Sequence, residues 1–155
     1  MDRGQLLKRL DAAWQELKAS YADLTEEQLL IPGVVGEWTL KDVLAHVTTW
    51  EEEALQYLPL IVAGGTPPRY STQYGGIDAF NASSAARKRD LSLSQVLSQL
   101  EAMHRRLVAA AEAIPEEQIA RETRARRRLR LDTYSHYREH AKAVQAWREM
   151  QLGSD

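Results

Sequence analysis

The spacing of hydrophobic residues predicts four long amphipathic helices. In the first, apolar side chains recur every three or four positions with charged residues between them, at Leu6, Leu7, Leu10, Trp14, Leu17, Tyr21 and Leu24. The same period recurs over residues 40–61, 93–114 and 136–147. Such spacing places apolar side chains on one face of a helix, and the chain has no convincing strand-like alternation. We therefore expect an all-α protein, most simply a four-helix bundle.

Polar residues at the predicted helix starts support these boundaries. In each case a residue that can cap a helix is followed three positions later by a partner that can bond back to it. The pairs are Thr39 and Asp42 for the second helix and Ser92 and Gln95 for the third, while Thr25 and Gln28 predict a single short turn before the second helix. Pro115 should end the third helix, because proline cannot continue the hydrogen-bond ladder. Pro59, inside the second helix, should kink it or loosen its last turn.

The segment between the second and third helices is the longest interruption of the pattern. Residues 63–68 are rich in glycine and proline and should end the second helix. An irregular connection is expected over 69–76, followed by a short extra helix over 77–90. Segments of this length can form lids or pocket walls, but an ordinary surface excursion is the preferred interpretation.

Length and composition narrow the class of protein. A chain of 155 residues fits one domain over 1–155, and no apolar run approaches the ~20 residues of a membrane span. The N-terminus shows no secretory signal, so we expect a cytoplasmic protein. The chain has no cysteine, which excludes disulfides and thiolate ligands. A metal site must therefore use His, Asp or Glu.

Charge argues against nucleic acid as a partner. The formal net charge is −2, and binding to nucleic acid depends on neutralising phosphates. The exception is the segment from Arg121 to Arg130, which holds six arginines and one glutamate. These guanidinium groups suit an anionic ligand, and Arg126 is a candidate substrate contact. A solvated connector remains the preferred interpretation, since the segment has no aromatic residue for base stacking.

Three histidines are candidate metal ligands. His136 and His140 are four residues apart, so they share one helix face, and two neutral imidazoles on one face can bind one metal ion. Half-buried histidines without a metal are the alternative. Metal sites in bundles draw ligands from facing helices, which makes His46 of the second helix the third candidate. His104 lies on the inner face of the third helix, either as a core histidine satisfied by a hydrogen bond or as a support for the ligands.

The sequence resembles the DinB/YfiT-like superfamily, closest to its ClbS/DfsB-type branch. The resemblance rests on the segment Gly36-Glu37-Trp38-Thr39-Leu40-Lys41-Asp42-Val43-Leu44-Ala45-His46, continued by Thr49-Trp50-Glu51, on Ile77-Asp78-x-Phe80-Asn81-Ala82, and on Thr133-x-x-His136-Tyr137-x-x-His140 with Trp147 beyond. It implies an up-down-down-up bundle, often a homodimer. It also implies a divalent ion (zinc, nickel, iron or manganese) held by His46, His136 and His140. Relatives include thiol-dependent transferases and maleylpyruvate isomerases, which makes a low-molecular-weight thiol a candidate second reactant.

A second motif match is local. Residues 136–140 spell the H-x-x-E-H of inverted zinc peptidases, in which the glutamate is a general base. Those enzymes take their third ligand from well downstream, whereas only 15 residues follow His140. We interpret the match as coincidence, and Glu139 projects about 100° around the helix from His140.

Three functions remain open. The first is a metal-dependent enzyme, a hydrolase or thiol transferase, in which the ion activates water or a substrate thiol. The second is a protein that binds or sequesters a small molecule without catalysis, and the third is an interaction module with a structural metal or none. Glu53 is the candidate base or hydrogen-bond acceptor behind the ligands. The candidate contacts to a small-molecule substrate are Trp50, Asn81, His104 and Arg126.

Overall fold

The protein is helical throughout the part of the chain that its computed structural model describes, residues 1–153. The helices are α1 (Arg3–Tyr21), α2 (Leu40–Val62), α3 (Tyr70–Gln73), α4 (Ile77–Lys88), α5 (Leu93–Glu112), α6 (Arg124–Asp132) and α7 (Tyr134–Gln151), with short 3-10 turns at Gln28–Leu30 and Glu116–Gln118. Within 1–153 the only β pairing is an isolated bridge between Val35 and Trp38. The predicted all-α class is confirmed.

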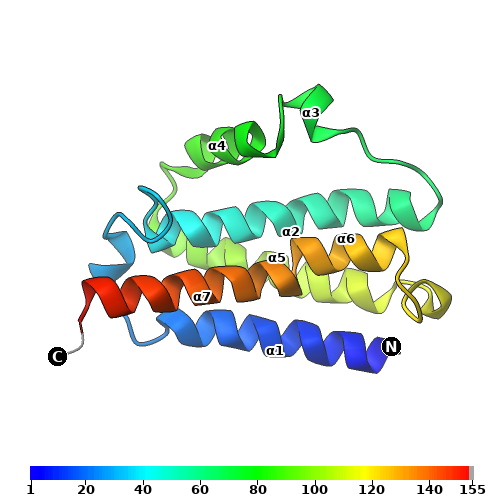
Figure 1. Cartoon of the computed structure of the whole chain (residues 1–155), viewed down its shortest axis with the longest axis horizontal. Helices are drawn as coiled ribbons and strands as arrows, with labels where there is room; N and C mark the ends of the chain where they lie inside the picture. The colour runs from blue at the N-terminus through cyan, green and yellow to red at the C-terminus, as the bar shows by residue number, and fades with distance from the viewer. Residues whose placement is uncertain (154–155) are drawn as a thin grey trace.

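The bundle has four helical segments along one axis in the up-down-down-up order, namely α1, α2, α5 and the consecutive helices α6 and α7 (Figure 1). Helix α1 packs against α7, while α2 packs against α5 and α6. Helices α2 and α5 run in the same direction, so the chain must return along the bundle between them. The segment that holds α3 and α4 makes this return over the outside of α2 (Figure 1). No helix among the described residues is long and apolar enough to cross a membrane.

Predicted caps set the start of the main helices. Thr39 accepts a hydrogen bond from the backbone N–H of Asp42, whose side chain accepts one from the N–H of Thr39. Ser92 and Gln95 exchange the same pair of bonds at the start of α5. Each box satisfies donors that a helix N-terminus otherwise leaves open. Helix α2 continues through Pro59 to Val62.

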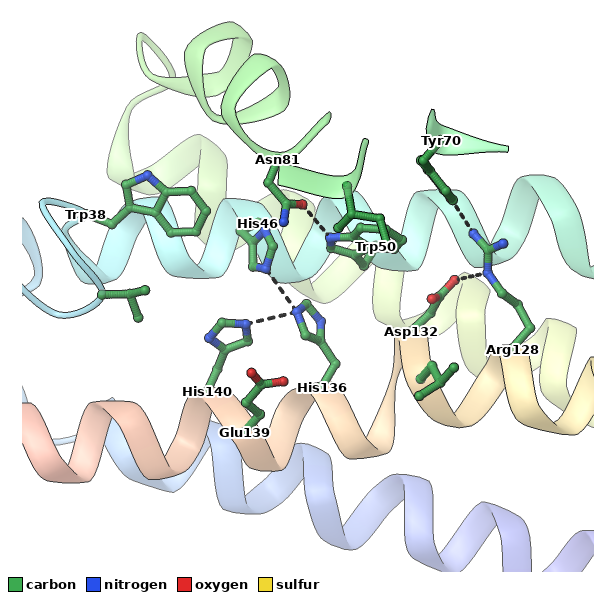
Figure 2. Close-up of a pocket in the computed structure, with 13 residues that line it drawn as sticks. Trp38, His46, Trp50, Tyr70, Asn81, Arg128, Asp132, His136, Glu139 and His140 are labelled. Carbon is green, nitrogen blue, oxygen red and sulfur yellow. Dashed lines mark hydrogen bonds and ion pairs between the residues drawn. The ribbon is translucent and has the colours of Figure 1, made fainter. Parts of the chain in front are cut away.

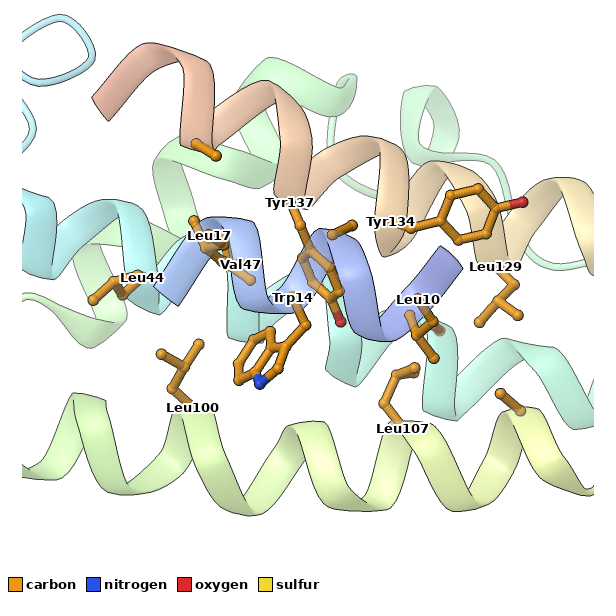
Figure 3. Close-up of a cluster of buried hydrophobic side chains, with 14 of the residues drawn as sticks. Leu10, Trp14, Leu17, Leu44, Val47, Leu100, Leu107, Leu129, Tyr134 and Tyr137 are labelled. Atoms are coloured by element: carbon orange, nitrogen blue, oxygen red, sulfur yellow. The ribbon is translucent and has the colours of Figure 1, made fainter. Parts of the chain in front are cut away.

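The core lies inside the bundle, where the apolar faces of the helices meet (Figure 3). Leu17 of α1, Leu44 of α2 and Leu100 of α5 are fully buried, and so is Tyr137 of α7. Such side chains each contribute about 1.5–3 kcal/mol by leaving water. The stripe read from the sequence is thus the core face of each helix.

Two segments differ from expectation. Residues 69–76 contain the one-turn helix α3 rather than only irregular chain. The arginine segment is not a solvated connector, because most of it forms α6, with Ala125 and Leu129 buried. Helix α6 ends at Asp132, and Thr133 breaks the backbone with φ −128° and ψ −95° before α7 begins. The fourth helical segment of the bundle therefore consists of two helices that meet at Thr133.

Candidate metal centre

Three imidazoles from two facing helices converge on one point (Figure 2). His136 Nε2 lies 2.9 Å from His46 Nε2 and 2.9 Å from His140 Nε2. All three candidate ligand atoms lie within 4.8 Å of one another. The structure thus brings together the three histidines that the sequence analysis grouped.

Local structure explains how each imidazole reaches this point. The Thr39 cap starts α2, and His46 follows about two turns later on the side that faces α7. On α7 the four-residue spacing stacks His136 and His140. Tyr137 and Val144 are fully buried and hold α7 against the core. The orientation of the pair is therefore a consequence of core packing.

The histidines are held in their neutral form. Burial lowers the pKa of His46 to about 3, and the nearby His140 and Lys88 add to the shift. Burial also lowers the pKa of His136, with further contributions from His140 and His46, and burial lowers that of His140. A neutral imidazole is the form that binds a metal ion, because its free nitrogen carries the lone pair.

The donor set fits a divalent cation. An ion bonded at 2.0–2.1 Å to nitrogens in tetrahedral directions keeps them about 3.3 Å apart, close to the separations found here. Three protein ligands would leave a fourth position of such an ion open, and all three histidines line a cavity. The buried Nδ1 atoms of His136 and His140 have no hydrogen-bond partner among the described residues. The Nε2 atoms, which converge on one point, are the ones that would bind a metal.

The cavity next to the histidines has a volume of about 540 Å³ and mostly apolar walls. The apolar and aromatic side chains that line it are Val35, Trp38, Trp50, Tyr70, Ile77 and Leu131. Trp50 Nε1 donates a hydrogen bond of 2.9 Å to Asn81 Oδ1, which fastens α4 over α2. This volume is within the range of sites for small molecules.

A polar cluster forms the end of the cavity away from His140 (Figure 2). Arg128 Nε donates to Asp132 Oδ2 at 2.6 Å, and Arg128 Nη2 donates to Tyr70 Oη at 2.5 Å. Tyr70 in turn donates to Glu53 Oε1 at 3.0 Å. Burial raises the pKa of Asp132 to about 6, although the Arg128 cation opposes the shift.

The polar cluster is not among the predicted site residues, although one part of it has a signal in the sequence. Arg128 and Asp132 are four residues apart, which is the spacing of an ion pair on one helix face, and Asp132 precedes His136 by the same interval. The interpretation of the arginine segment as a connector does not use this helical spacing. The contact with Tyr70 has no counterpart in local sequence.

The structure places the remaining predicted site residues in three different surroundings. Trp50 and Asn81 line the cavity. Glu53 does not line it and is bound by Tyr70 behind the wall. Arg126 is outside the cavity, where its guanidinium donates to the carbonyl of Ile119.

His104 is a core histidine held by hydrogen bonds, which is the first of the two alternatives that the sequence left open. Its Nδ1 lies 3.0 Å from Glu51 Oε2 and 3.2 Å from the hydroxyl of Tyr137, and its ring stacks on Trp14 at 3.6 Å. It does not line the cavity, so it has no direct access to a ligand there.

Comparisons with known proteins agree with this architecture. A profile of the DinB superfamily matches residues 9–148. An uncharacterised protein from Escherichia coli UTI89 superposes with a TM-score of 0.82 at 14% identity, over 99% of this chain and 96% of that one. No curated protein sequence matches.

Two further solved structures share the fold. DfsB, described as a sibling lethal factor precursor, has a TM-score of 0.81 at 15% identity and covers 99% of both chains. The colibactin self-resistance protein ClbS, in complex with double-stranded DNA, has a TM-score of 0.78 at 16% identity and covers 94% of both chains. At these identities the likeness shows the fold alone.

Proposed function

The chain belongs to the DinB superfamily, and we propose that it is a metal-dependent enzyme acting on a small molecule. In this proposal His46, His136 and His140 hold one divalent ion, and the substrate occupies the adjoining cavity. The observation that carries the proposal is the convergence of three neutral, buried imidazole nitrogens on the wall of a cavity of about 540 Å³.

The chemistry follows from the open side of the ligand set. A divalent ion there supplies a Lewis acid that makes water or a thiol a nucleophile near neutral pH. The protein's own residues bind the substrate's apolar part against Trp38, Trp50 and Ile77 and keep bulk water from it. Hydrolysis and thiol transfer are the two reaction classes that this arrangement supports, the second with a low-molecular-weight thiol.

The identity of the ion is a proposal based on the ligands. Three imidazoles without a thiolate suit zinc, nickel or iron, and manganese remains a further candidate from the family resemblance. The homodimer and the cytoplasmic location likewise stay predictions.

A small-molecule binding protein without catalysis is the second candidate function. The cavity itself supports this function, because neither its aromatic walls nor the hydrogen bond between Trp50 and Asn81 requires a metal. Nucleic acid is not part of either proposal, although the prediction that the chain does not bind it is not confirmed, since the ClbS structure contains DNA.

Metal binding by site variants tests the proposed centre. We expect untagged wild-type protein to bind about one zinc or nickel ion per chain, measured by elemental analysis and calorimetric titration. His46→Ala and the double variant His136→Ala/His140→Ala should lose this binding. His104→Gln is the control, because His104 lies in the core outside the site, and circular dichroism verifies its fold. Full binding by the double variant would overturn the site.

Catalysis is tested separately with generic probes. Metal-loaded protein should accelerate hydrolysis of 4-nitrophenyl acetate or transfer of glutathione to 1-chloro-2,4-dinitrobenzene, and His136→Ala should not. A metal bound at full occupancy with no rate above that variant for either probe would favour the binding protein.

A further inference from the structure

Asp132 is a buried carboxylate that faces the candidate metal centre. Its side chain is 5% exposed and lines the same cavity as the three histidines. One oxygen, Oδ2, accepts the hydrogen bond from Arg128 Nε. Figure 2 shows the other oxygen on the side of the cavity where the histidines lie. The carboxylate is thus fixed by one oxygen and presents the other to the cavity.

The orientation of Asp132 is set by a chain of groups from three helices. Arg128 is held between Asp132 and the hydroxyl of Tyr70, and its guanidinium carbon lies 5.4 Å from the ring centre of Tyr57. Glu53 accepts the hydrogen bond of Tyr70 at the far end. Such support keeps a reacting group in one position, which lowers the entropic cost of proton transfer.

We propose that Asp132 is the proton-transfer residue of this site, with Arg128 as its positioning residue. The inference rests on the proposed function, since it identifies the residue that accepts the proton of the nucleophile activated at the metal centre. As the nucleophile's oxygen or sulfur attacks, its O–H or S–H bond breaks and the proton moves to the free oxygen of Asp132. The bond to the leaving group breaks, and the same proton passes from Asp132 to the leaving atom, so the carboxylate is regenerated.

Asp132 suits this step better than the other nearby carboxylates. Glu53 is behind the cavity wall and its Oε1 is engaged by Tyr70. Glu139 lines the cavity, but its side chain is solvent-exposed, with no hydrogen bond that fixes it among the described residues. A general base acts best when it is held in place and its pKa lies near the working pH. Burial, which raises the pKa of Asp132 to about 6, supplies the second condition.

The charged and titratable groups around Asp132 set the pH at which it accepts the proton. Arg128 of α6 lowers its pKa, and Glu53 of α2 raises it. Tyr70 of α3 is linked to Asp132 through Arg128. Tyr137 and His136 of α7 are neutral, because burial raises the pKa of Tyr137 and lowers that of His136. Removing the Arg128 cation should therefore shift the titration of Asp132 to higher pH.

The pH dependence of the probe reactions tests the inference. In wild type kcat/KM should rise with pH to a plateau above about pH 6, because the ionised carboxylate is the base. Asp132→Asn should lower the plateau by about 10²–10⁴-fold and abolish the rising limb of the pH profile, with metal affinity unchanged. Arg128→Gln should move the limb to higher pH, and Arg128→Lys should restore it. Asp11→Asn, an exposed position on α1, is the matched control and should leave the profile unchanged.

Two outcomes would overturn the assignment. If Glu139→Gln removes the limb and Asp132→Asn keeps it, Glu139 is the base. The second readout needs neither metal nor substrate: the carboxyl ¹³C resonance of Asp132 in metal-free protein should titrate near pH 6, and titration below about pH 4.5 would contradict the inference. Failure of the proposed function is distinct, because it appears as absent metal binding or absent rate in wild type.

Discussion

At the scale of single residues, the three imidazoles couple the stability of the metal-free protein to pH. The unfolded chain binds protons at its histidines below about pH 6.5, whereas burial holds the pKa of folded His46 at about 3. Between these values the unfolded state carries the extra proton. The contribution is therefore fully present above pH 6.5 and is lost as the pH falls toward the folded pKa.

We expect the free energy of unfolding of metal-free protein to fall as the pH is lowered from 7 to 5.5. His46 accounts for about 1.4 kcal/mol of this loss, because pH 5.5 lies about one unit below the pKa of histidine in the unfolded chain. Urea denaturation at the two pH values measures the loss in wild type and in His46→Gln, and the variant should lose less by about this amount. Asp132 acts in the opposite direction, since its raised pKa favours folding as the pH falls, so the difference between the two proteins is the relevant quantity. Equal losses in both would contradict the buried, neutral state of His46.

At the scale of elements, α4 is the cover of the cavity and is fastened to α2 at two points. Trp50 Nε1 donates to Asn81, and Lys88 forms an ion pair with Glu52 at 2.5 Å. Only Phe80 and Ser84 of α4 are buried, so few apolar contacts hold the helix down. An element held by few buried side chains opens locally at a lower cost than the core.

Trp50→Phe should loosen this cover without unfolding the bundle. The variant keeps an aromatic ring in the wall and removes the donor to Asn81, which costs about 0.5–1.5 kcal/mol for the lost hydrogen bond. Amide hydrogen exchange over 77–88 should become faster, while exchange in the middle of α5 should not change. Trp38→Phe is the control, because Trp38 lines the cavity without bonding to α4. Unchanged exchange in α4 of the Trp50 variant would show that the ion pair and Phe80 suffice to hold it.

At the scale of the whole molecule, the core is continuous without the candidate centre. The buried side chains of α1, α2, α5 and α7 form one cluster, and the histidines lie at its edge facing the cavity. A metal at the edge should therefore add stability to a bundle that already folds.

Chelation should lower the melting temperature while the helical signal at room temperature persists. A ligand bound only by the folded state stabilises it by about 2.7 kcal/mol at a hundredfold excess over Kd, which corresponds to about 5–10 °C for a chain of this size. Thermal melts with and without chelator measure the shift, and His136→Ala should show none. Loss of helical circular dichroism at room temperature on chelation would instead indicate a structural metal and favour the interaction module.

Local sequence patterns predicted the four long helices and the three candidate ligands, but not α3 or α6. Helix periodicity, caps and the four-residue spacing of His136 and His140 depend on residues that are neighbours in the chain, so they can be read without a fold. The grouping of His46 with that pair needed only the expectation of a bundle with facing helices, together with the family resemblance. Distances of 2.9 Å between their nitrogens agree with that grouping.

The surroundings of the ligands depend on contacts between distant segments of the chain. Arg126 and Arg128 are both in the same basic segment, yet Arg128 reaches the cavity and Arg126 turns to Ile119. Tyr70 meets Arg128 from 58 positions away in the chain. The rotation of α6 depends on its packing against α2 and on the break at Thr133. These are contacts between distant parts of the chain, and no local spacing encodes them.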